Sequence, residues 1–389
     1  MRTPEEELAG IRARGLWRQV GSFEPVPGTM QCRFNGRDLV HWASNDYLGL
    51  ANSPELQAAF HESVARLGAG SGASRLIVGT RASHLALEEE LAEFEGTGAA
   101  LTFSSGYVTA VSAIPAIVGK GDVVILDKLC HACLIDGARL SGALMRVFPH
   151  NDLEKLRSHL HWARRQIEAR GRILIVAESV YSMDGDFGDL AGMAALKEEA
   201  GALLLVDEAH GVGLYGPMGQ GRVEELGLGD RVDLRMGTLS KALGLAGGYL
   251  CASRSWIDLL INSGRGWIYS TAPPAALTEA ARHALRMLRG DEGARRRARL
   301  WENVAALDEA LGRTGIDPSP IRPVRVGEAE AALALSESLR RRGHHVPAIR
   351  FPTVPKGTAR LRVSLSADHR KEEIGSLARI LREPELHGD

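Results

Sequence analysis

The sequence predicts an α/β protein with a large, mostly parallel seven-stranded sheet and a small α+β domain at its C-terminal end. Short β-branched or apolar runs alternate with helical-period segments between residues 99 and 253. That alternation is typical of a parallel sheet with helices on both faces. From about residue 324 the pattern changes to helices interleaved with short strands, which indicates a second unit. The length of 389 residues also favours two domains over one.

The expected elements follow from the spacing of apolar residues along the chain. Helices are expected at 54–67, 84–95, 273–288 and 294–313. The strands of the large sheet are expected at 99–103, 122–126, 144–148, 173–177, 202–206, 233–237 and 248–252. The C-terminal part reads as a helix, a strand, a Pro-rich turn, a strand and a final helix, at 328–342, 346–349, 351–357, 359–365 and 369–381.

These elements divide the chain into three parts. We expect an N-terminal arm over 1–45, a large domain over 46–285 and a small domain over 286–389. The sequence has no internal repeat, no low-complexity tract and no long flexible linker, so the two domains should share a rigid interface.

Composition and charge exclude several classes of function. Lys and Arg number 47 and Asp and Glu 48, so there is no basic field for nucleic acid or an anionic membrane. Apolar runs of about five residues are far shorter than the roughly 20 that span a bilayer. The acidic start resembles neither a secretory signal nor a transit peptide, and four cysteines are too few for a disulfide framework. We therefore expect a cytoplasmic protein with a small neutral or anionic ligand.

A carboxylate and an imidazole follow the end of one buried strand. In the run Val206-Asp207-Glu208-Ala209-His210, Asp207 and His210 lie where ligands of α/β sheets bind. An Asp-Glu-Ala-His run also occurs in nucleotide hydrolases, where the first carboxylate holds magnesium. That function needs a phosphate loop of the form G-x-x-x-x-G-K-[ST], which this sequence lacks.

Two further patterns have ordinary explanations. The run Gly211 to Gly216 formally matches G-x-G-x-x-G, but a dinucleotide site must open a helix, and a proline and two glycines follow instead. Cys130 and Cys133 flank His131 within four residues, which could suggest zinc. A structural zinc site needs a second pair of ligands, so we expect helix packing and no metal.

Lys241 lies in a turn of small and hydroxyl residues directly after an apolar strand. Most lysines are solvated surface groups. A lysine at a strand end near Asp207 and His210 can instead become a desolvated amine of lowered pKa, which forms a Schiff base with a carbonyl group. The residues alone leave both interpretations open.

Taken together, these residues resemble the core of the fold-type I pyridoxal phosphate (PLP) enzymes. Asp207-x-x-His210 followed by Thr238-x-x-Lys241 carries this resemblance. Several further segments narrow it to the α-oxoamine synthases, which condense an amino acid with an acyl thioester. They lie at 44–50, 70–80, 84–88, 127–132, 181–186 and 268–271, and the match runs in order from about residue 40 to the C-terminus.

The resemblance implies PLP as the cofactor and gives five residues a role. Asp207 would keep the ring nitrogen protonated through the effect of opposite charge. Lys241 would bind the cofactor covalently and then move the Cα proton of the amino acid. His210 and Ser182 would hydrogen-bond the phenolic oxygen of the ring. His131 would stack on the ring and polarise the thioester carbonyl.

The phosphate of PLP should lie at a helix N-terminus. Ser105, Gly106 and Tyr107 open a helix after the strand at 99–103, so backbone N–H groups and the helix dipole would form an anion site. Hydroxyl groups of Thr238 and Ser240 would add donors.

The family pattern also implies a shared site and an anchor for the amino acid. In the family a Ser-Thr pair, here Ser270 and Thr271, comes from the neighbouring subunit, which implies a homodimer. Arg362 resembles the arginine that binds the amino-acid carboxylate in bidentate fashion, and Asn45 would assist it.

The substrates are suggested by the C-terminal motifs. The segments 349–355 and 357–362 are most similar to family members that join L-alanine to a pimeloyl thioester. Sister activities that use glycine or serine with acetyl, succinyl or palmitoyl thioesters share the same cofactor residues. A pimeloyl chain ends in a carboxylate, for which Arg350, Thr353 and Arg18 are the proposed partners.

Two departures from the family pattern stand out. Cys130 and Cys133 occupy positions where small hydroxyl residues are expected, directly beside His131. The first 40 residues match the pattern poorly, although this arm usually helps to close the site over the acyl chain.

Overall fold

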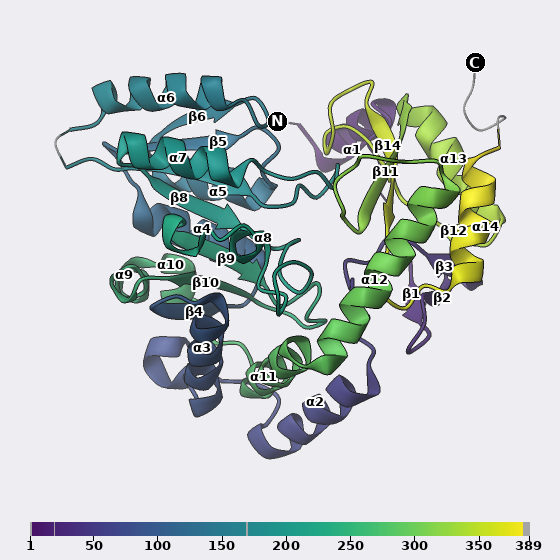
Figure 1. Ribbon diagram of the computed structural model, residues 1–389, viewed down its shortest axis with the longest axis horizontal. Helices are drawn as coiled ribbons and strands as arrows, with labels where there is room; N and C mark the ends of the chain where they lie inside the picture. Colours follow the sequence, from purple (N-terminus) through teal and green to yellow (C-terminus); the bar gives the residue numbers. More distant parts are fainter. Residues whose placement is uncertain (1, 19, 169, 384–389) are drawn as a thin grey trace.

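The computed structural model describes residues 2–18, 20–168 and 170–383. Its largest sheet has helices on both faces (Figure 1). The strands are β4 (Ala99–Phe103), β5 (Val123–Asp127), β6 (Leu144–Phe148), β7 (Ile173–Glu178), β8 (Leu203–Asp207), β9 (Leu234–Thr238) and β10 (Gly248–Ala252). They are ordered β4-β10-β9-β8-β7-β5-β6. The strand β10 runs antiparallel to both neighbours, whereas the pairs from β9 to β6 are parallel. All seven predicted strands are confirmed within one residue.

Alternating side chains of β5, β7 and β8 fill two cores, one on each face of the sheet, whereas Ala100 of β4 and Tyr249 and Cys251 of β10 belong to a third core shared with the small domain. On β5, Val124 and Leu126 pack with Ile114 on one face, and Val123 and Ile125 pack on the other. The first core is covered by α4 (Gly106–Ile117), α5 (Ala132–Ser141), α9 (Arg254–Ser263) and α10 (Arg265–Ile268). The second is covered by α6 (Leu153–Gln166), α7 (Leu190–Ala200) and the short α8 (Arg222–Glu225).

Further helices pack against one another beside the large sheet, and the last of them reaches the small domain. They are α2 (Pro54–Leu67), α3 (Ala82–Glu95), α11 (Ala275–Arg289) and α12 (Asp291–Ala310), with a π-helical turn at Arg75–Gly79 and a 3-10 turn at Gly229–Arg231. The helix α12 is the long element that runs from α11 to the small domain in Figure 1. Across the described ranges, none of the helices combines the length and apolar character needed to cross a membrane.

The small domain is built on a three-stranded sheet in the order β11-β14-β13. Its strands are β11 (Ile321–Gly327), β13 (Ala348–Ile349) and β14 (Ala359–Ser364), and its helices are α13 (Ala329–Arg341) and α14 (Lys371–Leu381). The strand β11 was not predicted, because its apolar residues are interrupted by Arg322, Pro323 and Arg325. The first residues of β11 are buried and pair with β14, and this pairing makes the segment a strand although its sequence lacks the pattern of one.

The N-terminal arm is part of the small domain's structure and not a separate extension. It holds α1 (Pro4–Ala13), β1 (Phe23–Pro25), β2 (Gln31–Phe34) and β3 (Arg37–His41). The strand β3 pairs in parallel with β12 (His344–His345) to complete a four-stranded sheet. These strands have two to five residues, too few to show a clear period, so sequence patterns did not predict them.

Four histidines gather where β3 and β12 meet the end of the small domain. His41 and His345 are opposite each other in the register of the two strands. His369 stacks on Trp42 with ring centroids 3.9 Å apart, and His344 accepts from or donates to Ser376 at 3.0 Å. Burial lowers the pKa of His41 and of His345 to about 4 and that of His369 to about 3. All four rings are therefore neutral in the folded protein near pH 7.

Acid should lower the stability of the folded protein because these rings then become protonated. The unfolded chain binds protons near the ordinary histidine pKa of 6.5, so the contribution of a neutral buried ring is lost as the pH falls from about 6.5 towards 4. Other buried carboxyl groups titrate in this range, so His41→Leu should be compared with the wild-type protein at each pH. Between pH 7 and pH 5, denaturant unfolding should show the stability difference moving by about 2 kcal/mol in favour of the variant. A constant difference would contradict this prediction.

Candidate active site

The strands β5, β7, β8 and β9 end at the same edge of the large sheet, and each brings a polar side chain there. Asp127, Glu178, Asp207 and Thr238 are the last residues of these strands, and all four are buried. This edge lies on the side of the sheet where parallel α/β proteins place their ligands. The candidate site is built around it.

Asp207 and Lys241 form the centre of the site. Asp207 accepts a hydrogen bond from the N–H of Ala209 at 2.9 Å, and burial raises the pKa of its carboxyl group. Burial also lowers the pKa of Lys241 to about 8, although the charges of Asp207 and Glu178 act in the opposite direction. A fraction of the amine is therefore neutral at physiological pH and available as a nucleophile.

The turn after β9 is fixed by its own hydrogen bonds. The Thr238 hydroxyl donates to the carbonyl of Gly247 at 2.9 Å and accepts from the N–H of Ser240 at 3.2 Å. Gly244 ends the turn with a φ of +72°, and a Cβ there would lie 2.3 Å from the backbone nitrogen of Ala51. Only glycine fits this close approach. The turn thereby places Lys241 where its charge interacts with that of Asp207.

A chain of polar contacts joins the large domain to β14. The Tyr47 hydroxyl lies 2.6 Å from Nδ1 of His210 and donates to Oδ1 of Asn45 at 3.2 Å. Asn45 also accepts from Nη2 of Arg362 at 3.1 Å. The Arg362 guanidinium donates from Nε to the carbonyl of Ser182 at 2.6 Å. The predicted residues Asn45, Ser182, His210 and Arg362 are therefore brought together from four separate segments.

His131 is the N-cap of α5, and its ring lines a cavity. Its backbone N–H donates to the carboxyl group of Glu178, and its Nδ1 lies 3.0 Å from Sγ of Cys133. Burial lowers its pKa, with opposing contributions from Asp207 and Lys241. His131 is therefore a neutral ring close to the central pair.

The start of α4 forms an anion-binding cradle. Ser105 is the N-cap and accepts from the N–H of Val108 at 3.1 Å. The N–H groups of the first helical residues, Gly106 and Tyr107, have no acceptor within the helix. A Cβ on Gly248 would lie 2.6 Å from the nitrogen of Gly106, so the helix start lies directly against β10. Thr238 and Ser240 contact each other at 2.7 Å through their hydroxyls.

This donor set fits PLP. An amine of lowered pKa can react with the aldehyde of PLP, and a buried carboxylate near that amine can hold a proton on the ring nitrogen. A helix start with hydroxyl groups can bind the phosphate. The residues are Lys241, Asp207, and the group Ser105, Gly106, Tyr107, Thr238 and Ser240.

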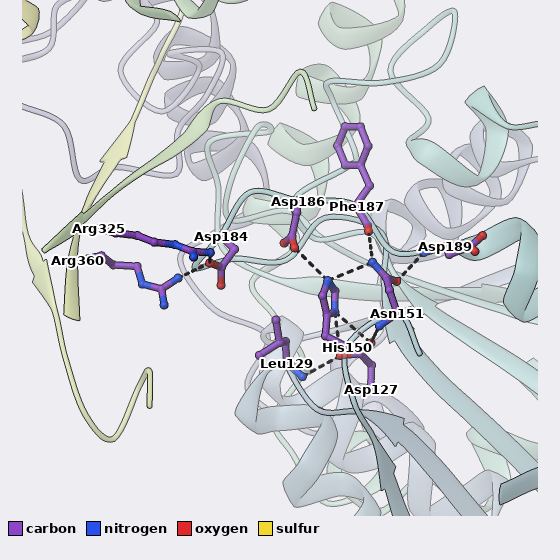
Figure 2. A network of polar contacts seen from close by, with 10 residues as sticks. All are labelled: Asp127, Leu129, His150, Asn151, Asp184, Asp186, Phe187, Asp189, Arg325 and Arg360. Atoms are coloured by element: carbon purple, nitrogen blue, oxygen red, sulfur yellow. Dashed lines mark hydrogen bonds and ion pairs between the residues drawn. The ribbon is translucent and has the colours of Figure 1, made fainter. Parts of the chain in front are cut away.

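A cavity of about 1020 Å³ opens beside His131 and Ser182. Part of the polar network of Figure 2 forms one wall, and in this network charged His150 bridges two carboxylates. Its Nδ1 lies 3.1 Å from Asp127 and its Nε2 lies 3.0 Å from Asp186, contacts that raise its pKa to about 10 even though burial opposes them. This bridge holds the segment after β7, which carries Ser182, against the end of β5.

The same segment is held from the small domain. Asp184 forms an ion pair with buried Arg360 of β14, and the more exposed Arg325 of β11 lies 3.6 Å from the same carboxylate (Figure 2). Both arginines line the cavity of about 1020 Å³. The two domains therefore meet at this wall through ion pairs.

A second cavity of about 840 Å³ lies under the N-terminal arm. It shares Phe351, Pro352 and Thr353 with the first cavity, and its lining includes Arg18 and Arg350. Arg350 donates to the carbonyls of Gly15 and Trp17, and the second of these bonds measures 3.1 Å. Other lining residues are apolar, namely Leu8, Ile11, Leu16, Leu333, Ala348 and Ile349. Arg350 thus ties the arm over this cavity.

Ser270 and Thr271 lie apart from these contacts, at the surface of the chain. Thr271 forms an isolated antiparallel bridge with Ser74. Nearby on both segments, large apolar side chains are exposed: Leu76 at 52%, Ile77 at 74%, Val78 at 62% and Tyr269 at 73%. Such a group of exposed apolar residues is typical of a protein interface.

Two residues of the site were given no role by the sequence. Tyr47 connects Asn45 with His210, and Glu178 binds the backbone of His131. Glu178 ends a buried strand next in register to Asp207, so its position at the same sheet edge was a usable signal. The contacts of Tyr47 span 163 positions of sequence to His210, and no local pattern predicts them.

Comparisons with known proteins identify the family of the chain. A model of the aminotransferase class I and II family matches residues 37–381. The 8-amino-7-oxononanoate synthase of Geobacter sulfurreducens is 45% identical and covers 97% of both chains. A solved structure of serine palmitoyltransferase with PLP has a TM-score of 0.91 at 30% identity, covering 98% of both chains. A crystal structure of 8-amino-7-oxononanoate synthase from Francisella tularensis has a TM-score of 0.74 at 27% identity, covering 88% of this chain and 96% of that one.

Proposed function

This chain belongs to the aminotransferase class I and II family and, within it, to the α-oxoamine synthases, and from that premise we propose that it condenses L-alanine with a pimeloyl thioester. The products are 8-amino-7-oxononanoate, carbon dioxide and the free thiol. The observation that carries this proposal is the 45% identity over nearly the full length to a relative named for that product. PLP is the cofactor.

PLP supplies an electron sink that stabilises negative charge on the carbon next to the amino group. The Lys241 amine would hold the cofactor and, as a free amine, would take the proton from the Cα of alanine. The Asp207 carboxylate holds a proton on the ring nitrogen, which the sink requires. Ser182 and His210 bind the phenolic oxygen and orient the ring.

The remaining residues bind the two substrates. Arg362, fixed by Ser182 and Asn45, binds the carboxylate of alanine in a geometry that lysine cannot reproduce. The incoming thioester occupies the cavity of about 1020 Å³, where His131 donates a hydrogen bond to its carbonyl oxygen. This bond stabilises the charge that develops on the oxygen during attack.

The acyl chain extends into the second cavity under the N-terminal arm. The two cavities share the segment from Phe351 to Thr353, and the second is lined mainly by apolar side chains. At its polar end, Arg18, Arg350 and Thr353 are available to the terminal carboxylate of a pimeloyl chain. Arg350 already binds carbonyls of the arm, so Arg18 is the residue we assign to the direct ion pair.

We also propose a homodimer in which Ser270 and Thr271 complete the phosphate site of the partner. The exposed apolar group at Leu76, Ile77, Val78 and Tyr269 supports this assembly, because burial of such a group is favourable. Light scattering of the purified protein should give about twice the chain mass of 41.9 kDa. A monomeric mass with full activity would refute the shared site.

A sister activity is the second candidate, since the serine palmitoyltransferase structure has the higher TM-score. Initial rates of thiol release with PLP decide between them. L-alanine, glycine and serine are each combined with pimeloyl-, acetyl-, succinyl- and palmitoyl-CoA. A preference for L-alanine with pimeloyl-CoA supports the proposal. A preference for serine with palmitoyl-CoA, or for glycine with a short acyl-CoA, would replace it with a sister activity.

A further inference from the structure

Cys133 contacts the ring of His131 in two ways. The backbone N–H of Cys133 donates to Nδ1 of His131 at 3.3 Å, and the Cys133 Sγ lies 3.0 Å from the same nitrogen. Both contacts come from the first turn of α5, which His131 caps. The sulfur and the amide therefore converge on one ring atom.

This arrangement determines where the ring proton lies. A backbone N–H can only donate, so this contact, at 3.3 Å long for a hydrogen bond, favours an unprotonated Nδ1 on His131 but is too weak to fix the tautomer alone. Burial raises the pKa of Cys133 far above neutrality and lowers that of His131, so the thiol is protonated and the imidazole is uncharged. The S–H group is therefore a second donor to Nδ1, and the ring proton lies on Nε2.

The backbone of His131 is fixed independently of its ring. Its N–H donates to the carboxyl group of Glu178, which is only 2% exposed at the end of β7. The ring lines the cavity of about 1020 Å³, and Nδ1 is turned towards the helix. The edge that carries Nε2–H is then the one left for a ligand in that cavity.

We propose that Cys133 is a positioning residue, which holds His131 in the tautomer whose Nε2–H points at the carbonyl oxygen of the acyl thioester. This inference rests on the proposed function for the identity of that acceptor. A hydroxyl group can donate to Nδ1 as a thiol does, which explains how cysteine replaces the small hydroxyl residue expected from the family pattern. Cys130 has no such role, since its thiol donates to the carbonyl of Val176 at 3.4 Å.

The direct test is nitrogen NMR of protein labelled with ¹⁵N-histidine, in the PLP-loaded form without substrate. The His131 signals are assigned by their loss in His131→Gln. The wild-type protein should show an unprotonated Nδ1 and a protonated Nε2. A protonated Nδ1 in the wild-type protein would overturn the proposal without the need for any variant.

Variants separate positioning from simple packing. Cys133→Ala removes the S–H donor, so the tautomer with a protonated Nδ1 should become populated and the His131 pKa should rise by about half a unit or more. Its kcat should fall about tenfold with little change in KM for alanine, which binds at Arg362. Cys133→Ser should restore the wild-type tautomer and pKa, and Cys130→Ser, the matched control, should match the wild type in both.

Two results with the variants would also overturn the inference. One is a Cys133→Ala protein with the tautomer and pKa of the wild type, and the other is failure of folded Cys133→Ser to restore them. The NMR readout needs no substrate, so it is independent of the rate panel. If no substrate pair reacts but the tautomer is as expected, the proposed function fails and the geometry at His131 remains.

Discussion

Replacement of Lys241 by alanine is expected to abolish turnover while leaving the protein folded. In the proposed function this amine holds the cofactor and moves the Cα proton, whereas the other lysine at this sheet edge, Lys128, follows β5 with an exposed side chain. Loss of both roles should lower kcat by about 10³-fold or more. The thiol-release assay measures this, and thermal unfolding checks the fold.

Covalent attachment gives a second readout. After reduction with borohydride, mass spectrometry should find the cofactor on the peptide that contains Lys241 in the wild-type protein and on no peptide of Lys241→Ala. Lys120→Ala, at an exposed position away from the sheet edge, is the matched control and should behave as the wild type. Near wild-type activity in Lys241→Ala would disprove the assignment of this residue.

The variant Asp207→Asn is expected to lose most activity, by about 10²-fold or more, because an amide cannot keep the ring nitrogen protonated. The fold should survive, since the amide oxygen can still accept the hydrogen bond from Ala209. Thiol release measures the loss. Asp230→Asn, an exposed carboxylate, is the control for the same chemical change.

Asp207→Asn should also change the titration of Lys241. The Lys241 pKa of about 8 is a balance between burial, which lowers it, and charges such as that of Asp207, which raises it, so removal of the Asp207 charge should move that pKa lower. The rate at which cofactor-free protein captures PLP should therefore rise with pH through about 8 in the wild type. In the variant the rise should occur at lower pH. An unchanged midpoint would mean that the two groups do not interact.

Much of the large domain was predictable because its strands are buried on both faces. Val123 to Leu126 and Leu203 to Val206 are continuous apolar runs, and their separation by helical segments is visible without any structure. The predicted ends of these strands fell one residue short of the observed ends, because the last residue of each strand is polar. The backbones of Asp207 and Thr238 pair with neighbouring strands, although polar side chains of this kind are typical of loops.

The small domain was harder to predict. Its strand at His344–His345 is stabilised by β3, a partner far away in the chain, and local propensity says little about such pairings. Within the site, Lys241 and Asp207 were recognised because each follows a recognisable strand. Tyr47 and Glu178 were not, although Glu178 ends a buried strand, because the side chain that Tyr47 contacts and the backbone N–H that Glu178 binds are brought close only by the fold.

The N-terminal strands cannot complete their sheet until almost the whole chain has left the ribosome. Trp42 and its hydrogen-bond partner His344 are 302 positions apart, and β12 supplies the neighbour of β3. During synthesis the edge of β3 therefore stays open while the large domain folds behind it. Chaperone binding to nascent chains should concentrate on this early segment and end only when β12 emerges.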